Sequence, residues 1–412
     1  MALTQLVSRG FQDEDLTVAN GPATSPFAKV FKKHAPYAME CIESVFDGTV
    51  GYGQRIASTI PRRGDLVAGM HLQITLRKLG NDSFFPAEQL VSCVELQLGK
   101  VTFERIPNDW LRCRQWLFAT ETEQQSYAML TDFYGNAVVP DGTIRTFYLP
   151  LPFYFNNRPD LWIPLIAAQY HDVTVFVELA SSQAVAGIDP SFAPIVRLFV
   201  DYAFLGTWER RLVAQSEHQM VVEQLQHQVS PCHLAPEPVL HKIDIAFNHP
   251  CRWIAWHMGS PLLPNVYTGS ATPGETDPAY APLRHVTLML NGTPRWQRRE
   301  GSYFNLMQPR QFLRGAASPP AGLYFYSFSR APLDPAVSET GDSTLNFSRI
   351  DAPVLTFSTK AANVDTASGE QILDTINTTS VEAQQLTNIT IYASNFNVLV
   401  VKNGMFGLKY AC

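Results

Sequence analysis

The chain has 412 residues, of which 46% are hydrophobic and 17% are charged. This length exceeds the size at which one hydrophobic core usually stops growing, and the composition excludes a largely disordered chain, so we expect two folded domains. The 31 Lys and Arg residues against 37 Asp and Glu residues give a net charge of −6. This balance excludes a global positive field for holding nucleic acid, and no direct nucleic-acid binding is expected.

The N-terminal residues 1–27 mix Gly, Pro, Ser and Asp with few periodic apolar positions. Such a segment has no core of its own, and we expect an arm that gains structure by docking on other surfaces. Acidic residues appear at Asp13 and Glu14, where a signal peptide would need a long apolar region. No run in the sequence approaches the roughly 18 apolar residues of a membrane span, which predicts a soluble protein made in the cytosol.

The tripeptide Arg63-Gly64-Asp65 is the sequence that integrins recognise. It stands directly before the apolar run Leu66-Val67-Ala68, where Gly and Asp are typical of a turn that precedes a strand. We therefore interpret it as a turn and not as an attachment site.

Alternating apolar residues predict strands on both sides of this region. Residues 72–76 and residues 173–179 each place apolar side chains at every second position, which puts one face of the strand on a core. The 25 Phe, 15 Tyr and 29 Pro residues favour strands joined by rigid loops. The sequence therefore predicts an all-β protein.

One long segment, residues 207–226, predicts a helix, because it is rich in Glu, Gln, Arg and Leu and free of Gly and Pro. A lone helix followed by a proline-rich stretch, between two β-rich halves, is typical of a domain connector. We predict an N-terminal arm at residues 1–27, a first β-domain at 28–206, a helical connector at 207–238 and a second β-domain at 239–412.

The two halves share a hairpin pattern. Residues 94–98 alternate before Gly99, and residues 286–290 alternate before Asn291-Gly292, a type I′ hairpin signal. An aromatic residue and an arginine follow each turn, namely Phe103 with Arg105 and Trp296 with Arg298. Two similar β-domains with many short strands and Pro/Gly-rich turns predict sandwiches or barrels.

Common catalytic signatures are missing from the sequence: it has no Walker-type phosphate loop, no H-E-x-x-H helix and no G-x-S-x-G elbow. The histidines are isolated, and we interpret His171 as a satisfied strand or rim residue. The cysteines form no C-x-x-C pair and no zinc-spaced cluster, so we expect reduced thiols. They are Cys41, Cys93, Cys113, Cys232, Cys251 and Cys412. We assign no catalytic residue, no cofactor-binding residue and no metal ligand.

Residues 288–312 and the block Asn346-Phe347-Ser348-Arg349-Ile350-Asp351 resemble the major capsid proteins of nucleocytoplasmic large DNA viruses, the group of iridoviruses, phycodnaviruses and marseilleviruses. Other matching segments occur in the family's order. They are residues 51–67, residues 149–175, Glu209-Arg210-Arg211, Phe247-Asn248-His249-Pro250 and the C-terminal ASNFNVLVVKNGMFGLKY. The chain departs from the family before Asn346, where it reads SETGDSTL in place of a proline- and glycine-bearing stretch that ends in Cys.

The resemblance implies a non-enzymatic major capsid protein built from two tandem eight-stranded jelly rolls. It implies a homotrimer of nearly hexagonal outline whose trimers join in a lattice and tile the icosahedral shell of a large double-stranded DNA virus. Minor capsid and penton proteins are implied as partners, and the N-terminal arm is expected to dock beneath the capsomer, towards the internal viral membrane or minor proteins. The expected location is the virion capsid, after synthesis and assembly in the host cytoplasm. Virus-specific loops at the outer crown of the trimer are expected among residues 181–194, 259–282 and 330–343.

Two other classes of protein are alternatives to a capsid protein. A tandem β-sandwich carbohydrate-binding protein is the alternative, since jelly rolls are common among lectins. It would bind glycans without self-assembly. A jelly-roll metal oxygenase or isomerase would need a His/carboxylate ligand set, which the sequence does not display at recognisable spacing.

Overall fold

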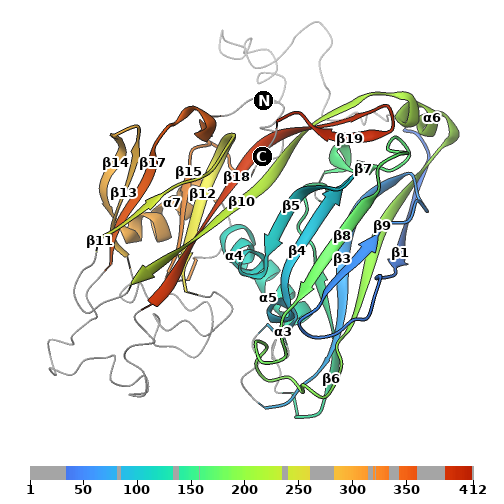
Figure 1. Ribbon diagram of the computed structural model, residues 1–412, viewed down its shortest axis with the longest axis horizontal. Coiled ribbons are helices and arrows are strands. Elements are labelled where there is room, and N and C mark those ends of the chain that lie inside the picture. Colours follow the sequence, from blue (N-terminus) through green and yellow to red (C-terminus); the bar gives the residue numbers. More distant parts are fainter. Residues whose placement is uncertain are drawn as a thin grey trace, which may run out of the picture. The chain divides into compact units, whose positions relative to one another are not determined.

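The computed structural model describes residues 34–80, 85–132, 139–156, 158–233, 240–259, 283–313, 319–320, 322–333, 343–359 and 386–410. A compact unit from Tyr37 to Cys412 holds the strands and helices named below (Figure 1). The predicted arm at residues 1–27 lies outside the described residues, as do most of the predicted loops at 259–282 and 330–343.

The first half of the chain forms two antiparallel sheets that face each other. One sheet has the order β1-β9-β3-β6, with the short β7 paired to β3, and the other has the order β2-β8-β4-β5. Their strands are β1 (Tyr37–Ser44), β2 (Arg55–Thr59), β3 (Leu66–Arg77), β4 (Val91–Leu98), β5 (Val101–Pro107), β6 (Ile144–Pro150), β7 (Ile163–Pro164), β8 (Val173–Leu179) and β9 (Ile195–Leu205).

The second half repeats this order. One sheet is β10-β18-β12-β15, with β16 paired to β12 and β19 to β18, and the other is β11-β17-β13-β14. Their strands are β10 (His218–His233), β11 (Leu240–Asp244), β12 (Pro250–Met258), β13 (Leu283–Leu290), β14 (Thr293–Glu300), β15 (Leu323–Ser327), β16 (Leu345–Asn346), β17 (Pro353–Thr359), β18 (Leu386–Lys402) and β19 (Met405–Leu408). Eight strands of each half follow the interleaved order of a jelly roll, so the predicted double jelly roll is confirmed.

Both predicted hairpins are present at equivalent places. The β4–β5 turn has φ of 60° at Gly99 and 70° at Lys100, and the β13–β14 turn has φ of 50° at Asn291 and 79° at Gly292. Positive φ at both central residues defines the type I′ turn, whose twist matches that of the flanking strands. The repeated sequence pattern therefore reflects a repeated structural element.

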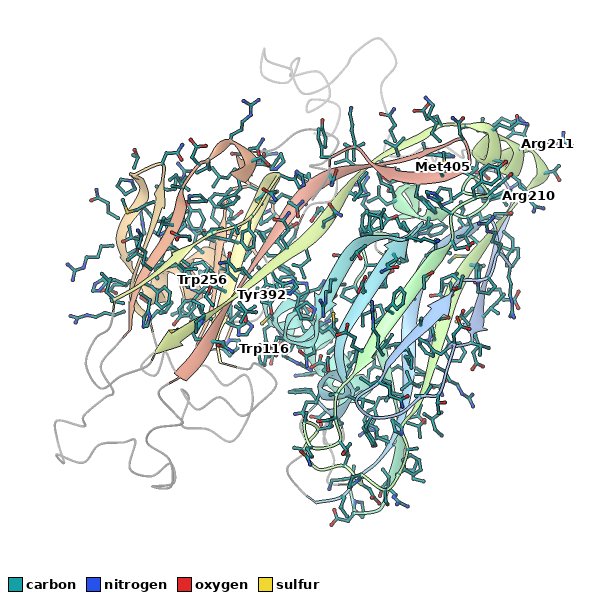
Figure 2. All side chains as sticks on the ribbon, in the orientation of Figure 1. Trp116, Arg210, Arg211, Trp256, Tyr392 and Met405 are labelled. Atoms are coloured by element: carbon teal, nitrogen blue, oxygen red, sulfur yellow. The ribbon has the colours of Figure 1, made fainter. Side chains whose placement is uncertain are left out.

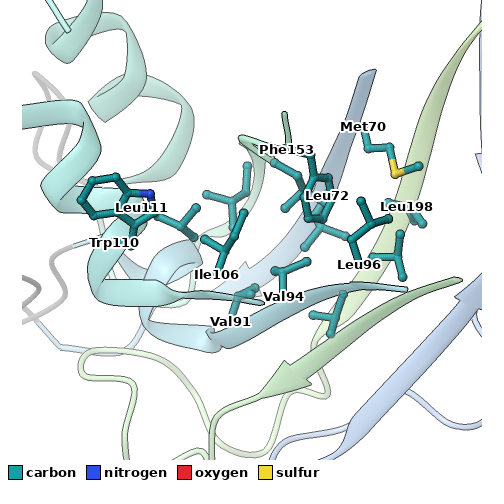
Figure 3. Packing of buried hydrophobic residues seen from close by; sticks show 14 of the residues in the cluster. Met70, Leu72, Val91, Val94, Leu96, Ile106, Trp110, Leu111, Phe153 and Leu198 are labelled. Carbon is teal, nitrogen blue, oxygen red and sulfur yellow. The ribbon is translucent and has the colours of Figure 1, made fainter. Parts of the chain in front are cut away.

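Strand β3 shows how the alternating pattern builds the core. Its side chains alternate between buried and half-buried positions, and Leu72, Ile74 and Leu76 are fully buried. Figure 3 shows Leu72 from this strand packed among Leu96 of β4 and Leu198 of β9. Strand β8 alternates in the same way, which confirms the second predicted strand. Apolar side chains from both sheets thus meet in one interior.

The predicted helix over 207–226 is wrong beyond Gln215. Helix α6 covers Thr207–Gln215, and β10 then begins at His218. All 16 residues of β10 are paired in register with β18. This ladder, with Val222 and Gln224 buried on one face, outweighs the helix preference of the Glu and Gln side chains. The second half of the predicted connector is therefore a strand of the second jelly roll.

Several helices were not predicted from the sequence. Between β5 and β6 lie α4 (Asn108–Phe118) and α5 (Glu121–Thr131), and α5 starts with a capping box formed by Thr120 and Glu123. Shorter elements are α3 (Pro86–Leu90), α7 (Gln308–Phe312), the π-helical turn η4 (Tyr303–Met307) and the 3-10 turns η1 (Pro159–Leu161) and η5 (Phe347–Arg349). None of the helices in the described ranges is long and apolar enough to cross a membrane.

Candidate functional site: the junction between the two jelly rolls

An aromatic cluster joins the two jelly rolls. Trp110 of α4 stacks on Trp253 of β12, with ring centroids 5.2 Å apart and planes 19° apart. The same indole ring packs against Tyr392 of β18 at 4.7 Å. Phe118, at the end of α4, meets Trp253 edge-on at 5.3 Å. One continuous cluster of buried apolar side chains consequently spans both jelly rolls, and α4 carries the first into contact with the second (Figure 1).

Polar contacts between β5 and β10 lie beside this cluster. The side-chain amide of Gln224 donates to the backbone oxygen of Phe103 at 2.7 Å. The amide of Asn397 in turn donates to Gln224 Oε1 at 2.9 Å and to the backbone oxygen of Tyr410 at 3.0 Å. These buried amides bond to backbone oxygens that have no partner in strand pairing. The bonds therefore fix the position of one jelly roll relative to the other.

Glu104 of β5 is a buried carboxyl group within this contact, with 8% of its surface exposed. Burial raises its pKa to about 8, although a hydrogen bond from the backbone of Leu225 acts in the opposite direction. The charge of Glu223 raises the pKa further. Glu104 is therefore mostly protonated at neutral pH, and the junction holds a neutral carboxyl group there.

A second contact joins the loop at Tyr170 and His171 to the β18–β19 hairpin. The backbone of Tyr170 donates to the oxygen of Gly404 at 2.9 Å, and the backbone of Phe406 donates to His171 Nδ1 at 3.1 Å. Gly404 has φ of 79°, and a Cβ atom there would lie 2.6 Å from the Tyr170 ring. The close approach requires glycine. His171 is a hydrogen-bonded junction residue, which confirms that it is satisfied.

The tripeptide at residues 63–65 forms the bend that leads into β3, with Arg63 exposed and Asp65 buried. Asp65 is 6% exposed and accepts a hydrogen bond from the backbone of Leu205 at 2.9 Å. Its other oxygen pairs with Arg210 Nε of α6 at 3.0 Å. A Cβ atom on Gly64 would lie 2.7 Å from Tyr202 Cβ. Asp65 thus anchors the start of α6, where Figure 2 shows Arg210, and the interpretation as a turn before β3 is confirmed.

Two other segments of the resemblance also meet in space. The backbone of His249 donates to Ser348 Oγ at 2.8 Å, and the backbone of Phe347 donates to the oxygen of His249 at 3.1 Å. Asn346 accepts from the backbone of Ser348 at 3.1 Å and so caps the turn. The Asn-Phe-Ser-Arg block therefore holds the bend that leads into β12. Its role is architectural.

Potential metal-binding side chains gather at one place among the described residues. Ligand atoms of Cys41, His71 and Asp201 all lie within 4.8 Å of one another, and the sequence analysis assigned none of them. The described cysteines are free thiols, as expected. Sequence reasoning also missed Trp110, although the spacing of Trp110, Leu111 and Leu117 in residues 108–118 is a signal for a helix with one apolar face.

Solved structures share this fold. The crystal structure of PBCV-1 VP54, fitted into a cryo-EM reconstruction of the virophage Sputnik, matches with a TM-score of 0.83 and 33% identity, covering 94% of this chain and 100% of that chain. The Faustovirus major capsid protein matches with a TM-score of 0.69 at 10% identity, covering 97% and 96%. Two jelly rolls of equal strand order, joined by a buried junction, define the class of double jelly-roll viral capsid proteins.

Family models and curated relatives agree with this class. Residues 25–206 match a model described as major capsid protein N-terminus, and residues 209–407 match one described as large eukaryotic DNA virus major capsid protein. The major capsid protein of Paramecium bursaria Chlorella virus 1 is 36% identical, and that of Pyramimonas orientalis virus is 30% identical. Each alignment covers 99% of both chains. The chain belongs to the major capsid protein family of large eukaryotic DNA viruses.

The role of the chain is thus structural, and its place is the virion capsid. The junction joins the two sandwiches into one unit. The carbohydrate-binding alternative finds no support in these comparisons.

Proposed function

We propose that the chain acts as a non-enzymatic homotrimer, in which three copies present six similar jelly rolls with a nearly hexagonal outline. The observation that carries the proposal is the repeated strand order of two jelly rolls that a continuous cluster of buried apolar side chains joins into one unit. Three copies of such a unit offer six similar flanks, which suits a hexagonal lattice position. Membership of the capsid family supports the same arrangement.

Exposed apolar side chains on α6 support self-association. Trp208 is 75% exposed and Leu212 is 52% exposed, and their spacing of four residues places them on one face of the helix. Obligate interfaces are more hydrophobic than ordinary surface, so we propose that this face contacts a neighbouring copy.

Light scattering of the purified protein tests the trimer. We expect a mass near three chains of 46.0 kDa, with little monomer released on dilution. The double variant Trp208→Ala/Leu212→Ala should weaken the trimer, whereas Val45→Ala, at another exposed apolar residue, should leave it intact. A stable, monodisperse monomer of the unmodified chain at micromolar concentration would refute the proposed trimer.

We also propose that the boundary between the two jelly rolls lies in α6. Strands of the first half end at Leu205 and those of the second begin at His218, and the two family models meet between residues 206 and 209. Folding of the two halves should remain coupled, because the aromatic cluster of the junction crosses this boundary.

The proposed partners beyond the trimer are other trimers, minor capsid proteins and penton proteins, with synthesis and assembly in the host cytoplasm. Residues 1–27 are proposed to dock beneath the capsomer, towards an internal membrane or minor proteins, because their sequence lacks a core pattern of its own. Deleting them should spare the trimer and reduce the yield of assembled shells. An unchanged particle yield would overturn this role.

A further inference from the structure

Three side chains with different ligand atoms lie on the outer face of the β1-β9-β3-β6 sheet. Cys41 of β1 stands directly opposite Asp201 of β9, and Asp201 stands opposite Gly69 of β3. His71 follows two residues after Gly69, so its side chain lies on the same face. Neighbours at such positions in adjacent strands are within side-chain reach, and the three ligand atoms lie within 4.8 Å of one another.

Gly69 leaves the space in which the oxygen atoms of this cluster gather. A Cβ atom on Gly69 would lie 3.1 Å from Asp201 Oδ2 and 4.0 Å from Asn156 Oδ1. Asn156 Oδ1 is itself buried and accepts no hydrogen bond from the residues described. Buried amide oxygens are nearly always paired, so this acceptor has room for a donor or a cation as its partner.

The other two ligand atoms are also held in place. The His71 ring stacks on Phe199, with centroids 5.4 Å apart and planes 9° apart, which limits rotation of the imidazole. The Cys41 side chain is exposed at the edge strand and its thiol donates a hydrogen bond to Asp201; partial desolvation together with this carboxylate raises the pKa of the thiol to about 11.

We propose that Cys41, His71 and Asp201 form a binding site for a divalent transition-metal ion of the Zn²⁺ type. A thiolate, an imidazole and a carboxylate suit this ion, with a fourth position left for water or for the Asn156 oxygen. In a tetrahedral site with the usual bond lengths, two ligand atoms lie about 3.6 Å apart. Side-chain rotations that shorten the longest distance between the three ligand atoms by about 1 Å would therefore bring them to binding distance of one ion.

Binding replaces the thiol proton by the metal ion: the S–H bond breaks, a metal–sulfur bond forms and the proton passes to solvent. The result is a cross-link between three strands. Strand β1 lies at the edge of its sheet and pairs only with β9 among the described strands, so the metal ion would secure that edge. The site has a structural role, and the ligands were hidden from motif searches because they come from three separate parts of the sequence.

Metal titration of the full-length protein, freed of metal by chelation, tests the site. We expect one Zn²⁺ per chain by elemental analysis after washing. Co²⁺ should produce a thiolate-to-metal charge-transfer absorption, and Zn²⁺ should raise the midpoint of thermal unfolding. The variants Cys41→Ser and His71→Phe should each weaken binding at least tenfold, and the phenyl ring of the latter preserves stacking on Phe199.

Cys232→Ala, at a buried thiol of the second jelly roll, is the matched control and should bind like the unmodified protein. Circular dichroism of each metal-free variant checks that it folds. Lack of stoichiometric binding by the unmodified protein would overturn the proposal. Binding that persists unchanged in both Cys41→Ser and His71→Phe would also overturn it, since the ion would then lie at another site.

Discussion

Replacing Glu104 by Gln should remove a pH dependence of stability that originates at the junction. The pKa of Glu104 is raised from 4.5 to about 8, chiefly by burial, so the folded state holds this proton more tightly than the unfolded state. The contribution of the protonated Glu104 carboxyl group to the free energy of unfolding is complete below about pH 4.5, and it is lost as the pH rises to about 8. Above that pH the carboxylate is charged in both states and the loss is complete.

The size of the effect follows from the rise in pKa. At about 1.36 kcal/mol for each pKa unit, a rise from 4.5 to about 8 corresponds to a loss on the order of 5 kcal/mol between these pH values. Gln keeps an oxygen that accepts from the backbone of Leu225 and carries no charge at any pH. Glu104→Gln should therefore match the unmodified protein near pH 4.5 and exceed it by several kcal/mol at pH 9.

Urea unfolding of the full-length protein, followed by tryptophan fluorescence at fixed protein concentration from pH 4.5 to 9, measures this difference. The variant Glu121→Gln, at an exposed position in α5, provides the control and should follow the unmodified protein at every pH. A parallel loss of stability in Glu104→Gln and in the unmodified protein above pH 6 would show that Glu104 is not the source of the pH dependence.

Three other substitutions test contacts at and near the junction by the same unfolding assay. Gly404→Ala should cost at least about 2 kcal/mol because of its positive φ and the nearby Tyr170 ring, whereas Gly407→Ala, with open space around it, should cost less than about 1 kcal/mol. An equal loss of stability in Gly404→Ala and Gly407→Ala would contradict the close contact between Gly404 and the Tyr170 ring. Trp110→Ala should cost about 3 to 5 kcal/mol, because it empties the space between α4 and the second jelly roll; a loss below about 1 kcal/mol would show that the aromatic cluster does not join them. Asp65→Glu should lower stability by about 1 to 3 kcal/mol through the displaced contacts to Leu205 and Arg210, with cell attachment of assembled particles unchanged. Lost attachment at normal thermal stability would restore the integrin interpretation.

Local patterns predicted the β-strands and hairpins well, because their causes lie within a few residues. The alternation in β3 and the Asn291-Gly292 turn are examples. The length of α6 was overestimated, since the pairing that makes residues 218–233 a strand comes from β18, far along the chain. The high aromatic content favoured a prediction of strands throughout the chain. Helix α4, whose apolar face is buried, was therefore not predicted.

Long-range partners were beyond prediction for the same physical reason. Asp65 and Arg210 each lie in a segment that resembles the capsid family, yet nothing in the sequence pairs them. The raised pKa of Glu104 depends on burial beneath β10, which no local pattern records. The resemblance supplied the capsid role, and the contacts explain why those segments have the residues that they have.

The apolar cluster that joins the two jelly rolls has a mechanical consequence for a shell. Since Trp110 of the first jelly roll is packed between Trp253 and Tyr392 of the second, bending the pair would open a well-packed interior and expose aromatic surface to water. We therefore expect a shell made of such units to acquire its curvature at the contacts between subunits, while each subunit stays rigid.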